Sequence, residues 1–462
     1  MQMNIFQSVG FVVTLIILVG LSVYSGKKAK GKSFSGSGNS GTTIVAGTII
    51  GTLVGGSSTI GTAQLAYNYG LSAWWFTLGA GIGCLVMALW FVKPLRAQNK
   101  LTITGMVNDA YGSKVGLTAT LLSSIGIFIN IIAQLIAATT IIAIFVPDIS
   151  ILGMAMIAAA LMILSVIFGG VTSAGMVGVL KTALLYLAAI GGGAVALYLF
   201  GGFGEIVSNP VLDHDTYFSL FARGVGKDLG AGLSLLFGVL STQTYAQAVL
   251  AGKSDRVSVK GALLSAALIP PIGIGGILIG LYMRVNYPDL ENAKFAFPTF
   301  ILDNMPPLIG GVIIATLLIA VVGTGSGLAL GISTIINQDI VQRATKKFAA
   351  PEKSMLVTRA CIIVILFVAC FFTTGKLGDI ILDFSFMSMG LRGAVLFVPL
   401  VCLLFFKKRK VKGCYALASV IAGPVAVFAG NFFIDSFDPL FMGIAINIVI
   451  MGVGLLKAEK KN

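Results

Sequence analysis

The chain has 462 residues, of which 57% are hydrophobic and only 10% are charged, whereas an ordinary soluble domain has roughly 25% charged residues. This composition excludes a soluble globular protein. The net charge of +14 would suit nucleic-acid binding if the Lys and Arg residues formed one face, but they lie in short clusters between apolar segments, so we expect no nucleic-acid partner.

The apolar segments predict an all-α polytopic membrane protein. A bilayer core of about 30 Å requires roughly 20 apolar residues in helical form, and about thirteen segments have this character. No basic residue precedes the first one, which favours a retained helix over a cleaved signal peptide. The predicted spans are 6–25, 44–66, 71–92, 117–146, 150–169, 174–200, 229–252, 259–283, 308–336, 356–374, 380–406, 413–434 and 439–456.

The basic residues predict the orientation of these spans. With thirteen spans, 24 of the 31 Lys and Arg residues fall on one side of the bilayer and five on the other. Because cytoplasmic loops carry the excess of Lys and Arg, we predict a multi-pass protein of the inner cell membrane with its N-terminus outside and its C-terminus in the cytoplasm. The two remaining cations, Lys181 and Arg392, fall inside predicted spans.

The second span contains Gly55-Gly56, followed by Ser57, Ser58 and Thr59. Paired glycines cost about 2 kcal/mol of helix propensity relative to paired alanines, and transporters bind their substrates where helices are interrupted near the midplane. We therefore predict a break that offers carbonyls to a cation and hydroxyls to a polar solute. A packing face of small residues is the alternative.

The seventh span carries the polar residues Gln243, Thr244 and Gln247. Amides and hydroxyls inside a membrane helix are costly unless they face water or each other. They are candidates for binding a polar organic solute, and hydrogen bonding between helices is the alternative.

The ninth span combines glycines spaced for close packing, Gly323, Gly327 and Gly331, with two hydroxyl residues, Thr324 and Ser326. Close packing explains the glycines. It does not require the hydroxyl residues, which therefore remain candidates for a polar site.

Catalytic and metal sites are not predicted. His214 is the only histidine and lies between two aspartates in a predicted outer loop, where an exposed turn is favoured over a titrating or metal-binding role. The five cysteines lack a CxxC pair. The spans also lack converging titratable groups, and the cytoplasmic loops are too short for an ATPase domain. These features favour a secondary transporter over an enzyme, with no organic cofactor.

Three segments resemble the sodium/solute symporter family, the group of the proline, pantothenate, sialic acid and sugar symporters. They are Gly56–Trp75, Gln243–Ser254 and Ile332–Ile340, in order along roughly 5–410. The resemblance implies a leucine-transporter-type core of two inverted five-helix repeats, 44–200 and 229–406, after one extra helix at 6–25 and before two at 413–456. It also implies symport of a small polar solute, coupled to a cation with sodium favoured, by alternating access.

The resemblance also implies a cation site. In this family Na⁺ is bound by carbonyls of the first core helix, at positions that correspond to Gly51 and Val54, and by the eighth core helix. The latter positions are Ala320, Gly323 and Thr324, so Gly323 lacks one of two expected hydroxyls. The candidate solute-binding residues are Leu53, Ser57, Ser58, Trp75, Phe76, Gln243 and Thr244.

Some family members have a second sodium site with an aspartate where this chain has Gly178, and Lys181 follows three residues later on the same helical face. A lysine inside the membrane is a functional hypothesis by default. Its ammonium could occupy the place of Na⁺ near Thr324, which would permit proton-coupled or ion-independent transport. It could instead neutralise a substrate carboxylate, or extend to the cytoplasmic end of its helix.

A membrane solute sensor built on a transporter fold is the alternative of another class. The short tail Lys457–Asn462 carries no signalling domain, which favours transport.

Overall fold

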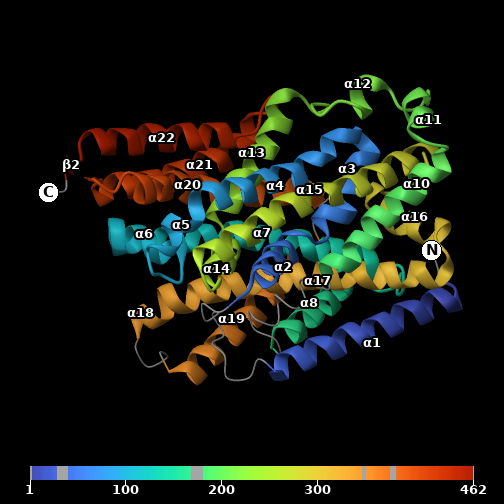
Figure 1. Cartoon of the computed structure of the whole chain (residues 1–462), viewed down its shortest axis with the longest axis horizontal. Helices are drawn as coiled ribbons and strands as arrows, with labels where there is room; N and C mark the ends of the chain where they lie inside the picture. Colours follow the sequence, from blue (N-terminus) through green and yellow to red (C-terminus); the bar gives the residue numbers. More distant parts are fainter. Residues whose placement is uncertain (1–2, 29–39, 168–180, 346–349, 375–380, 461–462) are drawn as a thin grey trace.

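The computed structural model describes residues 3–28, 40–167, 181–345, 350–374 and 381–460. These residues form a bundle of helices that run mostly along its long axis, with the two termini at opposite ends (Figure 1). The main helices are α1 (Ile5–Lys28), α2 (Thr42–Leu53), α3 (Thr62–Tyr69), α4 (Trp75–Val86), α5 (Val92–Arg96), α7 (Ser113–Ile142), α8 (Ile151–Ile167), α10 (Gly192–Phe200), α13 (Val225–Ser241), α14 (Gln243–Leu250), α15 (Asp255–Asn286), α17 (Pro307–Ile335), α19 (Pro351–Phe371), α20 (Ile381–Phe405), α21 (Gly413–Phe433) and α22 (Leu440–Leu456).

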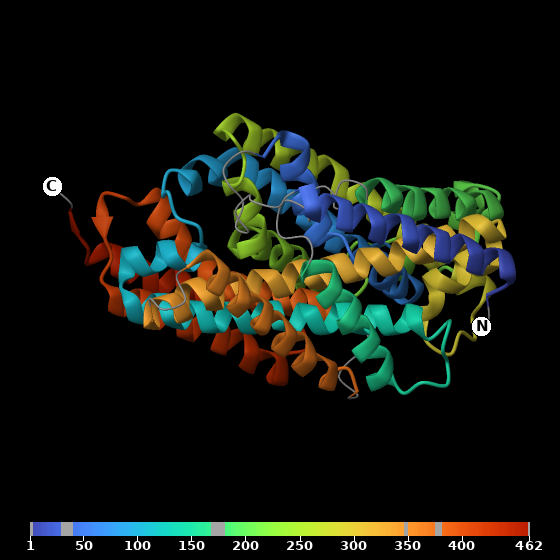
Figure 2. The ribbon, with the colours of Figure 1, turned by 90° about the horizontal axis from the view of Figure 1, so that it is seen from below.

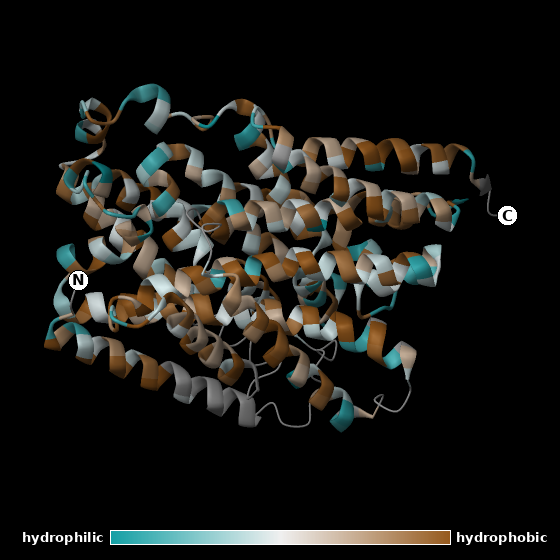
Figure 3. Cartoon of the chain, turned by 180° about the vertical axis from the view of Figure 1, so that it is seen from behind, coloured by the Kyte–Doolittle hydropathy of each residue, from teal (hydrophilic) through white to brown (hydrophobic). Residues whose placement is uncertain are grey.

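The helices have the length and surface of membrane spans. In the described part, eight are long and apolar enough to cross a bilayer, or nine if α13 and α14 form one span bent by 48°. Large apolar side chains such as Val364 and Phe433 are exposed on the outside of the bundle, and Figure 3 shows hydrophobic residues along its length and hydrophilic ones gathered near its ends. The chain is a multi-pass membrane protein. Within the described residues each predicted span overlaps helix, the fifth being described as far as Ile167 and the sixth only over Lys181–Phe200. The count of eight or nine is lower than the predicted thirteen because four apolar helices of the described part, among them Thr42–Leu53 and Ile151–Ser165, are shorter than a full span.

Short helices occupy three segments that the sequence predicts as loops: α6 (Ile103–Tyr111), α11 (Phe203–Ser208) and α12 (His214–Tyr217), and α16 (Ala296–Asn304). They are too short to give a membrane signal. Thr102 begins α6 by accepting a hydrogen bond from the Gly105 N–H, and Asp213 begins α12 in the same way. His214 is exposed on α12, as expected.

The C-terminal end of the bundle carries the basic segment at 407–412 and the basic tail at 457–460. There, β1 (Arg409–Lys410) pairs antiparallel with β2 (Glu459–Lys460) next to α6. At the opposite end lie the N-terminus, α11 and α16 (Figure 1). Between the two ends, α2 lies between α15 and α17, as Figure 2 shows. The predicted break in the second span is therefore enclosed by helices and shielded from lipid.

Candidate cation and solute site

The second span is broken at its paired glycines. Helix α2 ends at Leu53, and Val54 is extended, with φ −88° and ψ 110°. The chain resumes as a π-helical turn over Ser57–Gly61 that leads into α3. The predicted break is confirmed, and it leaves carbonyls at the end of α2 without their helical partners.

Both glycines are required by close packing at this break. A Cβ at Gly55 would overlap the Thr324 hydroxyl and would lie 2.8 Å from Gln134 Oε1. A Cβ at Gly56 would overlap the Ala137 side chain. The packing alternative is thus correct as well: the same glycines break the helix and bring α7 and α17 against it.

The Lys181 side chain extends into the break. Its Nζ donates hydrogen bonds to the Gly51 carbonyl at 2.6 Å and to the Thr324 hydroxyl at 2.7 Å. Thr324 Oγ1 also lies 3.1 Å from the Val54 carbonyl. The side chain is only 3% exposed, and none of the ion pairs among the described residues includes Lys181. The partial negative charge at the C-terminal end of α2 is therefore the natural counter-charge of this ammonium.

The structure thus brings four predicted cation-site residues together: Gly51, Val54, Thr324 and Lys181. The alternative in which Lys181 extends to the end of its helix is wrong, because its Nζ is held inside the bundle. A Cβ at Gly323 would lie 3.7 Å from that Nζ, in ordinary van der Waals contact, so the position of the missing hydroxyl adjoins the ammonium. Ala320 is buried one turn earlier on α17. The Gly178 position lies outside the described residues.

A polar network crosses the bundle beside the break. Gln134 accepts a hydrogen bond from the Gly56 N–H at 3.0 Å and donates to Ser57 Oγ at 3.0 Å. Ser57 Oγ is 2.6 Å from Ser385 Oγ on α20, and Asn130 Oδ1 accepts from both Gln134 and Ser385. These groups are neutral, paired and buried, so they suit a polar, uncharged part of a solute.

Sequence reasoning missed Gln134, Asn130 and Ser385. Two amides four residues apart inside an apolar 30-residue helix were a usable signal, because that spacing places both on one face and because such groups are costly in lipid. Ser385 carried no signal of its own.

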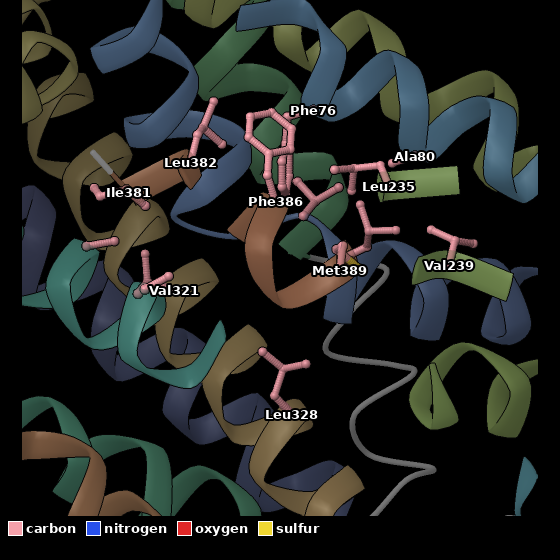
Figure 4. Close-up of a cluster of buried hydrophobic side chains, with 14 of the residues drawn as sticks. Phe76, Ala80, Leu235, Val239, Val321, Leu328, Ile381, Leu382, Phe386 and Met389 are labelled. Carbon is pink, nitrogen blue, oxygen red and sulfur yellow. The ribbon is translucent and has the colours of Figure 1, made fainter. Parts of the chain in front are cut away.

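The predicted solute residues separate into two groups. Leu53, Ser57 and Ser58 lie at the break, where Ser58 Oγ bonds the backbone of Gly55. Phe76 packs edge-on against Phe386 on α20, with ring centroids 5.8 Å apart (Figure 4).

The other predicted residues are held elsewhere. Trp75 Nε1 donates to the Leu220 carbonyl. Both polar atoms of the Gln243 amide bond the backbone of Leu101 and Ile103. Thr244 is buried, and its Oγ1 has no hydrogen-bond partner in the described part of the chain.

An ion cluster lies against the Phe386 ring of this aromatic pair. Arg223 Nε is 2.7 Å from the fully buried Asp228 carboxylate, and its Nη1 is 3.3 Å from Asp383 on α20. The guanidinium lies 5.4 Å from the Phe386 ring centroid. Arg223, Asp383 and Phe386 also line a cavity of about 540 Å³. Its other walls are parts of α13, α20 and α21 and the loop before α22. The polar network is therefore separated from this cavity by Phe76, Phe386 and Arg223.

Known proteins match this chain over nearly its whole length. It is 23% identical to the sodium/pantothenate symporter of Escherichia coli (strain K12), covering 95% of this chain and 94% of that protein. It is 24% identical to the high-affinity proline transporter of Bacillus subtilis (strain 168), covering 78% of each. The structure of a Na⁺-coupled sialic acid symporter in a substrate-bound outward-open state superposes with a TM-score of 0.80 at 19% identity and covers 99% of both chains.

The same architecture also matches Mhp1, a nucleobase-cation-symport-1 family transporter, with a TM-score of 0.59. The fold is therefore of the leucine-transporter type, as the resemblance implied. The family model of the sodium:solute symporters matches residues 34–423. The chain is a secondary active transporter and not an enzyme, and it belongs to the sodium:solute symporter family.

Proposed function

We propose that this chain transports a small polar organic solute by alternating access and that the Lys181 ammonium occupies the place of the family's sodium ion. One observation carries the proposal: Lys181 Nζ lies within hydrogen-bond distance of the Gly51 carbonyl and of the Thr324 hydroxyl. Two residues to which the family resemblance assigns Na⁺ thus already bind a cation that belongs to the protein.

The consequence concerns coupling. An ammonium is a compact point charge with three donors, so it satisfies the same oxygens that a bound Na⁺ would need. Transport would then be driven by protons, through loss and gain of the Lys181 proton, or would be exchange that needs no ion. Sodium symport, which the family supports, is the second candidate, and it requires Lys181 to leave Gly51 and Thr324 in the transporting state.

The solute is expected at the break, where neutral groups converge. The residues that favour this location are Leu53, Ser57, Ser58 and Phe76, together with Asn130, Gln134 and Ser385. Relatives are named for pantothenate, proline, sialic acid and choline, all of which are small and polar. A sensor function remains the alternative of another class, and measured transport distinguishes it from binding alone.

The proposed architecture is two inverted repeats, 44–200 and 229–406, after the helix at 6–25 and before the two at 413–456. It is supported by the position of the two broken spans, α2 with α3 and α13 with α14, at the start of each half. The proposed orientation has the N-terminus outside, because basic clusters gather at the C-terminal end of the bundle.

The first experiment uses sodium itself as the probe. Thermal unfolding of the purified chain is measured in NaCl and in N-methyl-D-glucamine chloride at equal ionic strength. The proposal expects the same melting temperature in both salts. A selective rise in sodium would overturn the role given to Lys181, while leaving the transporter assignment intact.

The second experiment identifies the solute and its coupling. A library of amino acids, organic acids, sugars and vitamins is screened for thermal stabilisation, and uptake of a positive compound into proteoliposomes is then driven by a Na⁺ gradient or by a pH gradient. Wild type should not require Na⁺, and Lys181→Ala should lose any response to the pH gradient. Strict Na⁺ dependence of the wild type would overturn the proposal.

A further inference from the structure

A second buried cation, Arg392 on α20, has no role in the site described above. Its side chain is fully buried. Nε donates to the Ser388 carbonyl at 3.0 Å, Nη2 to the Ser388 hydroxyl at 2.9 Å and to Met389 Sδ at 3.1 Å, and Nη1 to the Thr242 hydroxyl at 2.9 Å. All these acceptors are neutral, and none of the ion pairs in the described ranges includes Arg392.

One acceptor of this guanidinium, Thr242, lies at the bend between α13 and α14. Its backbone is extended, with φ −93° and ψ 128°, and the two helices meet at 48°. The Thr242 hydroxyl donates in turn to the Gly238 carbonyl at 2.6 Å. Arg392 is thus linked through one hydroxyl to the last turn of α13, where the carbonyls carry partial negative charge.

The same arginine is held against a third element, α7. Ser388 Oγ, which accepts from Arg392, donates to the Gly126 carbonyl at 2.5 Å. A Cβ on Gly126 would lie 2.7 Å from Arg392 Cγ. Arg392 therefore joins the bend of α13–α14, helix α20 and helix α7 at one point.

Lys181 makes the corresponding set of contacts. It lies on the fifth helix of the first proposed repeat. Its ammonium contacts the break in the first helix of the same repeat, at Gly51, and Thr324 on the third helix of the other repeat. Arg392 lies on the fifth helix of the second repeat and reaches the break in that repeat's first helix and, through Ser388, the third helix of the first repeat. This pairing rests on the proposed repeats, whereas the Arg392 contacts stand without them.

We propose that Arg392 is a positioning residue that clamps the α13–α14 bend to α20 and α7, and that it must release Thr242 before the cavity of about 540 Å³ between α13 and α20 opens. The walls of that cavity include α13, at Ala231 and Ser234, and α20, at Phe386 and Gly390. Since the clamp joins these two walls, its loss would let them separate. An inverted repeat exchanges the two sides of the membrane, so Lys181 would hold the opposite side closed.

Two matched alanines allow the proposal to be tested. Ala231 on α13 and Ala46 on α2 are each 2% exposed. Ala231 lines the cavity between α13 and α20, and Ala46 lines a separate cavity of about 260 Å³ beside Thr182. Each is replaced by cysteine in the full chain from which the five native cysteines have been removed. The rate of alkylation by a soluble maleimide is then measured in detergent, where the reagent reaches both sides.

Arg392→Met should raise the alkylation rate of the cysteine at position 231 by about tenfold, which is the effect of losing one or two charge-assisted hydrogen bonds. The alkylation rate at position 46 should stay within about twofold of the rate measured with Arg392 in place. Lys181→Met should give the reverse pattern. Arg392→Lys should restore part of the protection at position 231, because it keeps the charge.

Equal acceleration at both probes in Arg392→Met, or none at position 231, would overturn the proposal, since general loosening affects both sites alike. If Arg392→Met does not yield monodisperse protein, Thr242→Val decides the question, because it removes only the clamped hydroxyl. It should accelerate alkylation at position 231 alone, and an unchanged rate there would count against the clamp.

Discussion

The Lys181 ammonium and the Thr324 hydroxyl are 2.7 Å apart, and the neighbouring residue on α17, Gly323, has no side chain to fill the space beside them. A Cβ at Gly323 would lie 3.7 Å from Nζ, in ordinary van der Waals contact, so a side chain at position 323 would stand next to the ammonium. The lysine and the glycine are therefore parts of one arrangement, and exchanging both should change the ion that the site accepts.

The double variant Lys181→Ala with Gly323→Ser should acquire a sodium site. Removing the ammonium frees the Gly51 carbonyl and Thr324 hydroxyl, and the serine supplies the oxygen that position 323 lacks. Sodium at about 100 times its Kd stabilises a folded protein by about 2.7 kcal/mol, so NaCl should raise the melting temperature relative to N-methyl-D-glucamine chloride. The measurement is thermal unfolding in both salts.

Each single variant is a control for this exchange. Lys181→Ala alone lacks the second hydroxyl, and Gly323→Ser alone keeps the ammonium, so both should respond to sodium less than the double variant. A sodium response as large in Gly323→Ser as in the double variant would show that Lys181 does not occupy the ion's place.

Gln134→Leu should impair both stability and transport. The substitution leaves the buried Gly56 N–H without the acceptor that it has at 3.0 Å, and it removes the hydrogen bond that the Gln134 amide donates to Ser57 Oγ. An unsatisfied buried group costs about 1–3 kcal/mol, so we expect a lower melting temperature and about a tenfold loss of uptake. Thr139→Val on the same helix is the matched control, because among the described residues the Thr139 hydroxyl bonds the Ile136 carbonyl of its own helix and no other element. Equal losses in the two variants would contradict the role of Gln134.

These residues show how far the sequence predicts the site. The Gly55-Gly56 pair was sufficient to locate the break, because helix propensity is a local property. The amides of Asn130 and Gln134, which sequence reasoning missed, were a usable signal of the same local kind. The sequence could not decide among the alternatives for Lys181, because a long side chain can reach several partners and only the packing of the helices selects one.

Side-chain direction was equally hidden for Gln243, whose amide holds the segment at 101–103 and does not reach Ser57 in the structure. Helix α16 was missed for another reason. Nine residues give no span signal, although six of them are buried in the structure.

Gly55→Ala should be strongly destabilising. The new methyl group would overlap the Thr324 hydroxyl and approach Gln134, and overpacking a closed core costs about 1–3 kcal/mol. Gly191→Ala is the matched control, because a Cβ there meets nothing within 4 Å and replacing a helical glycine by alanine gains about 0.5–1 kcal/mol. Thermal unfolding should move in opposite directions for the two variants. A stable Gly55→Ala protein would show that the break can relax.

Asp438→Asn should stabilise the protein at neutral pH and lose this effect in acid. Burial raises the pKa of Asp438, in the loop before α22, against the opposing hydrogen bond from the Leu440 N–H. The folded state therefore prefers the protonated acid, and stability falls as the pH rises through the folded pKa. An asparagine keeps the acceptor for Leu440 without the charge, so its melting temperature should exceed that of the wild type at pH 8, and the difference should shrink toward pH 4.

Asp213→Asn provides the control of opposite sign for this pH dependence. Hydrogen bonds from the Thr216 side chain and the Asp215 N–H lower the pKa of Asp213 at the start of α12. The folded state therefore prefers the ionised acid, and the stability that this preference gives is present at neutral pH and is lost as the pH falls through the folded pKa. Asp213→Asn should lower the melting temperature at pH 8 and converge with the wild type in acid. Two variants that shift in the same direction at pH 8 would contradict the burial argument for Asp438.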